Sequence, residues 1–409
     1  MALFTAGYLA PYLLPTIVGR IDSDLPVTAT QAGAIGSALL LSSASAGFVF
    51  ASRVDRIGAR RLARAGLALA ALGYGGAALT TAVPAVVVGA ALGGFGSGTA
   101  TAVAATGIAA QRTPHRATTL GLLSVSALAS AIYLTVPRLG PGHGLPLAAI
   151  ALTAAAVWPL TAGLASGARP PAPPLAAPVR EPLPRRRAGL LLAGAMPLWA
   201  MAQNSLWGVS GRIGVTQAHL DEATVGVVFA LALGSGLLGV TAAGALGPRL
   251  GHALPVGAGT ALIAGCIALS AAATDLASFA TGEIAWNAVY PVVLSYVIGL
   301  AAALDPRGRW VVLVGSAASL GTAAGPLTGS LLSAHVGFPA MGLIVAAALL
   351  LVAIPMTAVA LRVGPVDTPD TAPDFTQPAE PVAILEIAVD TRTVPTTRVG
   401  YDTAGSEAD

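Results

Sequence analysis

The sequence lacks lysine entirely and contains a single cysteine, Cys266. One cysteine cannot form an intrachain disulfide or a cysteine metal cluster. Charged residues are also scarce, at 10% of the chain, whereas a typical soluble domain carries about a quarter. Because 55% of the residues are hydrophobic and the mean hydropathy is +0.78, these few charges cannot cover a water-facing surface. We therefore predict that much of the surface faces lipid.

Several functional motifs are missing as well. The chain has no histidine cluster, no Ser-His-Asp order and no phosphate-binding Gly-Lys motif, since the glycine-rich segment 93–98 lies in an apolar run without a following lysine. These absences argue against ATP-driven transport and against an enzyme, and we predict no cofactor and no metal. The arginines are spread among loops and form no patch, so we predict no nucleic-acid partner.

Apolar stretches of about 20 residues recur along the chain, separated by short clusters of Arg, Pro, Gly and Asp. A helix of that length crosses about 30 Å of hydrocarbon and satisfies its own backbone in lipid, whereas transmembrane strands are about 10 residues of alternating polarity. We predict an all-α membrane protein with twelve transmembrane helices. The predicted helices cover residues 2–19, 30–52, 63–83, 84–108, 116–137, 144–166, 188–209, 223–246, 253–273, 276–303, 310–333 and 338–361.

The arginines indicate an orientation. If alternate loops are assigned to opposite faces, 18 of the 21 basic residues fall on one face, and only Arg20, Arg138 and Arg212 fall on the other. The positive-inside rule makes the arginine-rich face cytoplasmic, with both termini inside. The first apolar segment lacks a basic leader and an Ala-x-Ala site, so we expect a retained helix. Abundant alanine without lysine suggests a genome rich in G and C, hence a bacterial inner or plasma membrane.

Composition also divides the chain. Proline is too dense in residues 167–187 for a helix, which predicts an extended cytoplasmic linker between two halves, 1–166 and 188–362. Residues 363–409 hold half of all the acidic residues together with many Thr and Pro, and we predict a disordered cytoplasmic tail. Each half then contains six helices.

The loop after the second predicted helix reads Ala-Ser-Arg-Val-Asp-Arg-Ile-Gly-Ala-Arg-Arg over residues 51–61. It resembles the signature G-x-L-a-D-R-x-G-R-R of the major facilitator superfamily, with alanine in place of the leading glycine and at position 59. The matching residues are Asp55, Arg56, Gly58, Arg60 and Arg61. The resemblance implies two six-helix bundles around a central cavity, and a charge cluster that latches one conformation. Alternatively, the arginines only set the topology.

A degraded copy of this loop, Gly-Ala-Leu-Gly-Pro-Arg-Leu-Gly-His, occupies residues 244–252 in the second half, with Pro248 in place of the acid. Such an echo six helices later is typical of a duplicated transporter. Two features of the resembled family's antiporters are absent, a Gly-Pro element in helix 116–137 and an arginine in helix 84–108. Gly325 and Pro326, in helix 310–333, are candidates for a gating joint, with static packing as the alternative.

One carboxylate, Glu283, lies clearly inside a predicted span, where charge is costly and usually functional. Trp286, Asn287 and Tyr290 follow at spacings that place all four on one helix face. We expect this face to line the cavity and Glu283 to exchange a proton or pair with substrate. The alternative is that Glu283 hydrogen-bonds Asn287 or a neighbouring helix to lock packing.

Two further helices carry similar residues, and the resemblance places both beside the cavity. These residues are Trp199, Gln203 and Trp207 in helix 188–209, and Tyr8 and Tyr12 in helix 2–19. Aromatic faces with few charges suit a flat, weakly polar or cationic ligand. Alternatively, Trp199, Trp207 and Tyr290 are interfacial anchors.

Charged residues also occur in the two equivalent outer loops. They are Arg20, Asp22 and Asp24 in the first half and Arg212, Asp221 and Glu222 in the second. We interpret them as solvated loop charge.

Together these features predict a monomeric secondary transporter of a small organic solute, coupled to protons, with export favoured by the aromatic cavity. Uptake of a nutrient or metabolite by the same fold, and a non-transporting membrane sensor or scaffold acting through the tail, are the alternatives.

Overall fold

The computed structural model describes residues 1–111, 113–164 and 182–363, and in these ranges the regular elements are helices, with no strand. The predicted all-α membrane fold is confirmed. Most of the predicted linker, Arg112 and the tail from residue 364 lie outside the described residues.

The first half contains a run of helices that follows the predicted ranges. They are α1 (Ala2–Tyr12), α2 (Leu14–Asp24), α3 (Ala29–Phe50), the 3-10 turn η1 (Ala51–Arg53), α4 (Val54–Ile57), α5 (Ala59–Ala78), α6 (Val83–Ala109), α7 (Pro114–Leu139), α8 (Gly144–Val157) and the 3-10 helix η2 (Trp158–Gly163). α1 and α2 form one predicted span that is bent by 48°.

The second half follows its predicted ranges equally closely. It contains α9 (Arg186–Arg212), the π-helix η3 (Ile213–Gln217), α10 (Glu222–Leu246), the 3-10 turn η4 (Gly247–Leu250), α11 (Ala253–Ala271), α12 (Leu276–Leu304) and α13 (Arg309–Val363). α13 is two helices joined at Gly337, whose φ of 78° breaks the helix between the last two predicted spans. Within the described ranges, eight helices are long and apolar enough to cross a membrane, or nine with the bent α1–α2 pair.

The bend between α1 and α2 has a local cause. Pro15 has no N–H and cannot donate to the carbonyl of Pro11, four residues earlier. The indole N–H of Trp207, from the other half, donates to this carbonyl at 3.1 Å. Pro15 therefore leaves the Pro11 carbonyl without its usual helical donor, and this carbonyl accepts a hydrogen bond that joins the two halves.

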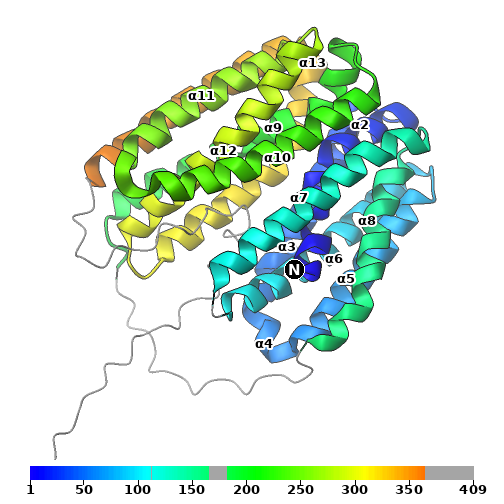
Figure 1. Cartoon of the computed structure of the whole chain (residues 1–409), viewed down its shortest axis with the longest axis horizontal. Coiled ribbons are helices and arrows are strands. Elements are labelled where there is room, and N and C mark those ends of the chain that lie inside the picture. Colours follow the sequence, from blue (N-terminus) through cyan, green and yellow to red (C-terminus); the bar gives the residue numbers. More distant parts are fainter. Residues whose placement is uncertain (112, 165–181, 364–409) are drawn as a thin grey trace, which may run out of the picture.

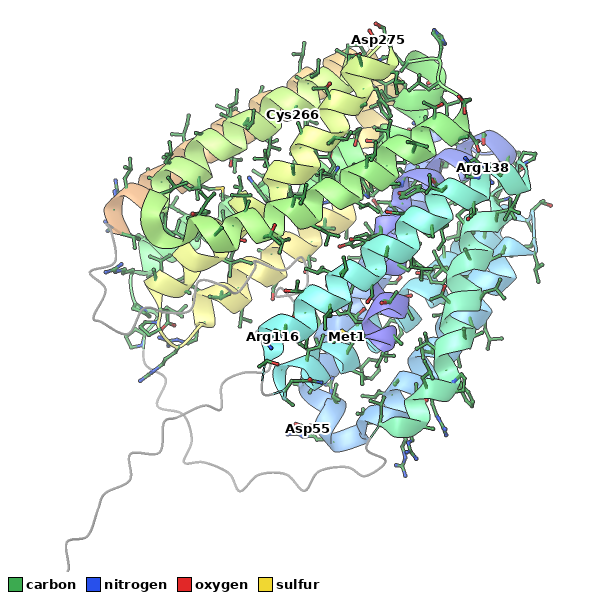
Figure 2. All side chains as sticks on the ribbon, viewed as in Figure 1. Met1, Asp55, Arg116, Arg138, Cys266 and Asp275 are labelled. Carbon is green, nitrogen blue, oxygen red and sulfur yellow. The ribbon has the colours of Figure 1, made fainter. Side chains whose placement is uncertain are left out.

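The two halves lie side by side, α1 to α8 in one and α9 to α13 in the other (Figure 1). α2, α3 and α7 of the first half meet α9, α13 and α10 of the second. Asp55 and Arg116 lie at one end of the molecule, and Arg138 and Asp275 lie at the opposite end (Figure 2). We call these the Asp55 end and the Arg20 end, because Arg20 lies near the close of α2. Which end is cytoplasmic remains a prediction.

Two helices at the Arg20 end begin at an aspartate that caps them. The Asp221 carboxylate accepts the backbone N–H of Thr224 at 2.9 Å, and the Asp275 carboxylate accepts that of Ser278 at 2.8 Å. The pKa of Asp221 is lowered chiefly by the Thr224 hydroxyl, which donates to its carboxylate at 2.6 Å, and then by the backbone bond, whereas the pKa of Asp275 is lowered first by the Ser278 backbone N–H. The caps set the first residue of α10 and of α12. They thereby set how far Glu222 and Glu283 lie from the Arg20 end.

Candidate functional site

A cavity of about 230 Å³ lies between the two halves. Its walls come from α1, α3, α6 and α7 on one side and from α9, α10, α12 and α13 on the other. Three of these helices, α1, α9 and α12, carry the residues that we expected from the sequence beside a cavity. The residues that line it and bear polar atoms or rings are Tyr8, Tyr12, Ser43, Thr101, Ser126, Gln203, Asn204, Trp207, Trp286, Asn287, Tyr290, Ser319 and Thr322.

The predicted aromatic residues divide into two groups. Tyr8, Tyr12, Trp207, Trp286 and Tyr290 line the cavity, as expected. Trp207 and Trp286 meet edge to face with ring centroids 5.9 Å apart. Both are more than nine-tenths buried among helices, so the interfacial-anchor alternative is wrong for Trp207.

Trp199 does not line the cavity and is fully buried. Its ring stacks on Tyr290 at 5.4 Å, and its indole N–H donates to the Thr260 hydroxyl at 3.2 Å. The expectation of a cavity-lining Trp199 is therefore wrong, and so is its alternative role as an interfacial anchor. Trp199 therefore packs against Tyr290, which lines the cavity, without lining the cavity itself.

Three amides that line the cavity share one orientation. The side-chain nitrogens of Gln203, Asn204 and Asn287 donate to the backbone carbonyls of Trp199, Ala200 and Glu283, each four residues earlier, at 3.1, 2.9 and 2.9 Å. A carbonyl can only accept, so the amide nitrogen must face it and the amide oxygen must point elsewhere. The Gln203 oxygen is buried without a hydrogen-bond partner.

Glu283 is fully buried and does not line the cavity, which corrects the expectation that it faces the substrate space. One carboxylate oxygen accepts the hydroxyls of Ser210 and Ser270, at 2.7 and 2.6 Å, and the other accepts the indole N–H of Trp286 at 3.0 Å. The two serines belong to α9 and α11, so neighbouring helices draw the carboxylate away from the cavity. Trp286 alone of these partners also lines the cavity.

Arg20 corrects a second expectation, since it is 3% exposed and not a solvated loop charge. Its guanidinium donates to the carbonyls of Gly140, Gly142 and Val136 at 3.0, 3.1 and 3.3 Å, in the same half. It also forms an ion pair at 2.7 Å with Glu222 of the other half. Burial of a charge is tolerated only when hydrogen bonds replace water, and here four acceptors do so.

A second ion pair also joins the two halves, but here the arginine belongs to the second half and the acid to the first. Arg212 of α9 pairs with Asp22 of α2 at 2.9 Å, and its guanidinium also lies 5.3 Å from the ring of Phe338. A smaller cavity of about 110 Å³ is bordered by both pairs. We call Arg20–Glu222 and Asp22–Arg212 the paired latch.

Apolar contacts and a hydrogen bond accompany the paired latch. The backbone N–H of Leu327, next to Pro326, donates to the Ser37 hydroxyl at 2.9 Å. Gly33 and Gly208 pack so closely against Pro326 that a methyl group at either position would clash. Gly325 packs in the same way against Asn204. The predicted gating pair Gly325 and Pro326 thus lies where α13 meets α3 and α9.

The signature loop lies at the Asp55 end, and its described contacts stay within one half. Arg60 donates to the carbonyls of Leu164, at 3.0 Å, and Ala162. Asp55, Arg56 and Arg61 are exposed. Gly58 has a φ of 99° and makes the tight turn between α4 and α5, as predicted.

Sequence reasoning missed the paired latch. It gave a hydrogen bond to a neighbouring helix as the alternative role of Glu283, which the structure shows, but it did not identify Ser210 and Ser270 as the partners. A usable signal existed for the latch, because each outer loop holds one arginine and several acids at equivalent places of the two halves. No sequence signal distinguished Ser210 and Ser270 from other small polar residues.

The chain matches the sequence model of a protein family described as the Major Facilitator Superfamily over residues 1–304. A search of the curated proteins gives no match. Similar solved structures include the human organic anion transporter MFSD10 (TETRAN), with 17% identity, a TM-score of 0.62 and coverage of 87% of this chain and 98% of that one.

An auto-inhibited POT family peptide transporter is also similar, with 15% identity, a TM-score of 0.67 and coverage of 92% and 98%. The inward-open xylose transporter XylE from E. coli shares 13% identity, with a TM-score of 0.65 and coverage of 87% and 94%. At these identities the likeness concerns the fold.

Proposed function

Because the chain belongs to the Major Facilitator Superfamily, we propose that it is a secondary active transporter that carries a small organic solute across the membrane by alternating access. The observation that carries the proposal is the cavity between the halves, bordered by side chains of both. The similar structures, which are transporters of organic anions, peptides and xylose by their names, support a small organic solute.

In this mechanism the paired latch closes the cavity at the Arg20 end and separates when that end opens. Glu222 and Asp22 are 45% and 23% exposed, so water can hydrate both carboxylates as the halves part. Hydration of the two carboxylates offsets part of the lost ion pairing when the halves separate. The latch can therefore hold one state without preventing the return to the other, as a transport cycle requires.

We further propose that Glu283 carries the coupling proton. Ser210 has a single hydroxyl proton but lies within reach of two acceptors, the Glu283 carboxylate at 2.7 Å and the Leu206 carbonyl at 3.0 Å. When Glu283 is ionised, Ser210 donates to it. When Glu283 is protonated, the acid donates to Ser210, which turns its own proton to Leu206. Both protonation states are thus satisfied without moving a helix.

Trp286 joins the proton site to the solute site. Its ring lines the cavity, and its indole N–H is one of three hydrogen-bond donors to Glu283. A solute that packs against this ring holds the indole N–H on the carboxylate and so stabilises its ionised form. In the proposed cycle, solute binding thereby favours proton release from Glu283, as export of a solute in exchange for protons requires.

The proposed direction is export, on the basis of the aromatic cavity walls. Uptake in whole cells compared with inverted vesicles distinguishes export from import. The tail on which a sensor or scaffold role depends lies outside the described residues.

The test is proton movement in reconstituted vesicles that contain a pH dye, with aromatic, cationic, neutral and organic-acid solutes added in turn. We expect a solute-dependent proton flux in the wild type that Glu283→Gln abolishes, because glutamine cannot release a proton. Asp275→Asn, which removes an exposed acid from the same helix but keeps a capping side chain, is the control and should transport normally. Solute flux with unchanged pH dependence in Glu283→Gln would rule out Glu283 as the proton carrier.

A further inference from the structure

A buried histidine lies in the short loop that joins α7 to α8. His143 is 4% exposed and immediately precedes α8. Its Nδ1 atom lies 2.5 Å from the Asp24 carboxylate of α2. Its Nε2 atom lies 3.0 Å from the Thr80 carbonyl and 3.3 Å from the Ala77 carbonyl. Each ring nitrogen therefore faces an oxygen atom that can accept a hydrogen bond.

These contacts determine how many protons the ring carries. A carbonyl and an ionised carboxylate can only accept hydrogen bonds, whereas a neutral imidazole has a single N–H and would direct one lone pair at an oxygen. The Asp24 carboxylate also accepts the backbone N–H of His143 at 3.0 Å and is 39% exposed, and both favour its ionised form. The proton between the two groups therefore belongs to the ring, and His143 is an imidazolium in this arrangement.

The end of α5 favours a positive charge at the same place. Ala77 lies in the last turn of α5, and Thr80 follows this helix. The last carbonyls of a helix lack helical donors and carry the negative end of the helix dipole. An imidazolium N–H at these carbonyls satisfies both the hydrogen bond and the dipole.

Few other charged groups lie near the ring. Arg20, one turn before Asp24 on α2, forms its ion pair with Glu222 of the other half. Arg138 of α7 is exposed, and its guanidinium donates to a carbonyl of its own helix. The helices α1 and α8 and the last two turns of α5 contain no charged side chain. Asp24 is therefore the charged partner of the ring.

The same loop supplies acceptors to the paired latch. Arg20 donates to the carbonyls of Gly140 and Gly142, at 3.0 and 3.1 Å, just before His143. Both glycines have a positive φ, 124° and 119°, which glycine adopts without strain. Arg20 and Asp24 hold the loop on α2, and the imidazolium holds it on α5. The proton of His143 therefore keeps in place two of the four acceptors of the buried Arg20.

We propose that His143 is a proton-binding site open to the Arg20 side of the membrane, and that its proton stabilises the closed state of the paired latch. Histidine changes charge between about pH 5 and 8. In acid both ring nitrogens donate, and the loop is held. As the pH rises the ring loses one donor, so the latch weakens. The effect on opening rests on the proposed transport function, whereas the protonation of His143 does not.

The protonation state is measured by ¹⁵N NMR of the purified full-length protein labelled at histidine, in which the signals of His143 are those lost in His143→Gln. We expect protons on both ring nitrogens at about pH 5.5 and the loss of one proton on titration to about pH 8.5. In Asp24→Asn the midpoint of this titration should move to lower pH, because no carboxylate then favours the charged ring. A histidine with a merely structural role would keep one proton throughout.

Closure of the Arg20 end is measured by the labelling rate of a cysteine introduced at Thr16, which borders the smaller cavity, in a Cys266→Ala background. At each pH the rate in His143→Gln is divided by the rate in the parent protein, so that ionisation of the thiol cancels. We expect a ratio of about ten at about pH 5.5, the equivalent of one charged hydrogen bond, and a ratio close to one at about pH 8.5.

His219→Asn is the matched control. His219 is exposed in the loop that precedes α10 at the same end, and asparagine tolerates its positive φ of 54°. This variant should leave the titration of His143 and the labelling profile unchanged.

The proposal is overturned if the His143 ring carries a single proton at about pH 5.5, or if the labelling ratio is the same at every pH. If His143→Gln does not fold, the signals that move in Asp24→Asn identify His143 and keep the titration decisive. Absence of solute flux in vesicles would contradict the transport function and leave the titration standing. Normal flux with a ratio that does not depend on pH would contradict this inference alone.

Discussion

The Arg20 end and the Asp55 end of the molecule use arginine in different ways. At the Arg20 end, Arg20 and Arg212 each form an ion pair with an acid of the opposite half. At the Asp55 end, the described bonds of Arg60 go to carbonyls of its own half. The end with fewer arginines thus holds the halves together. The difference teaches that the number of arginines reports topology, whereas burial between helices determines which of them can act as a latch.

The largest expected effect comes from removing the buried guanidinium of the latch. Arg20→Met leaves three buried or half-buried carbonyls without a donor and Glu222 without its partner, and we expect a loss of about 3 kcal/mol in unfolding free energy. Arg60→Met, its counterpart at the Asp55 end, should cost about 1 kcal/mol. Denaturant unfolding in detergent measures both. Equal losses would remove the contrast between the ends.

A wedge at the Arg20 end should shift the protein toward the state that is open there. Gly33 has no space for a side chain because α13 lies against it, so Gly33→Val should destabilise the closed state by about 1–3 kcal/mol. Labelling of a cysteine introduced at Thr16, which borders the smaller cavity beside the paired latch, reports opening of that end. Gly76→Val is the control, since nothing lies within 4 Å of its added Cβ. Unchanged labelling in Gly33→Val would show that this contact does not hold the end closed.

Exchanging the charges of Asp22 and Arg212 tests whether these two residues interact energetically. Asp22→Arg or Arg212→Asp alone should lower stability by about 1 kcal/mol and slow transport, because like charges then face each other across the interface. The double exchange should recover most of both losses, as a double-mutant cycle in stability and vesicle flux would record. Strictly additive losses would mean that the two residues do not interact.

The smallest effect is expected at the Asp55 end, where Asp305 pairs with Arg309 of the same half at 2.6 Å. Burial raises the pKa of Asp305, but the hydrogen bonds from Arg309 and from the Arg307 backbone outweigh it and bring the pKa below its ordinary value of 3.8. A depressed pKa contributes stability at neutral pH that is lost as pH falls through the lowered pKa. Asp305→Asn should lower stability by about 0.5 kcal/mol at pH 7 and show a shallower loss in acid. Unfolding measured across a range of acid pH checks this. If Asp305→Asn also changed cysteine labelling at the Arg20 end, the role of Asp305 would not be purely local.

The sequence predicted the helices well because their signal is local. A run of apolar residues bounded by Arg, Gly or Pro is sufficient to form a span in lipid, and even the break at Gly337 falls between two predicted spans. The family was equally accessible, through the Asp55 to Arg61 loop and its echo in the second half. Five of the predicted aromatic residues do line the cavity.

The site was only partly predictable. The sequence predicted that Glu283 and Trp199 face the cavity. Instead, the Glu283 carboxylate accepts hydrogen bonds from serines of two neighbouring helices, and the Trp199 indole stacks on Tyr290. In a membrane helix the lipid-facing side and the protein-facing side are both largely apolar, so hydrophobic periodicity does not reveal which side is inside.

The amino-acid sequence by itself determined that this protein is a bundle of membrane-spanning helices built from two related halves, and that it belongs to a transporter superfamily. The tertiary structure decided which charges are buried. Arg20 became a latch because it lies against three carbonyls and Glu222, and Glu283 lies outside the cavity lining because serines of two neighbouring helices donate to its carboxylate. Such roles depend on contacts between residues far apart in the chain, and no local pattern encodes them.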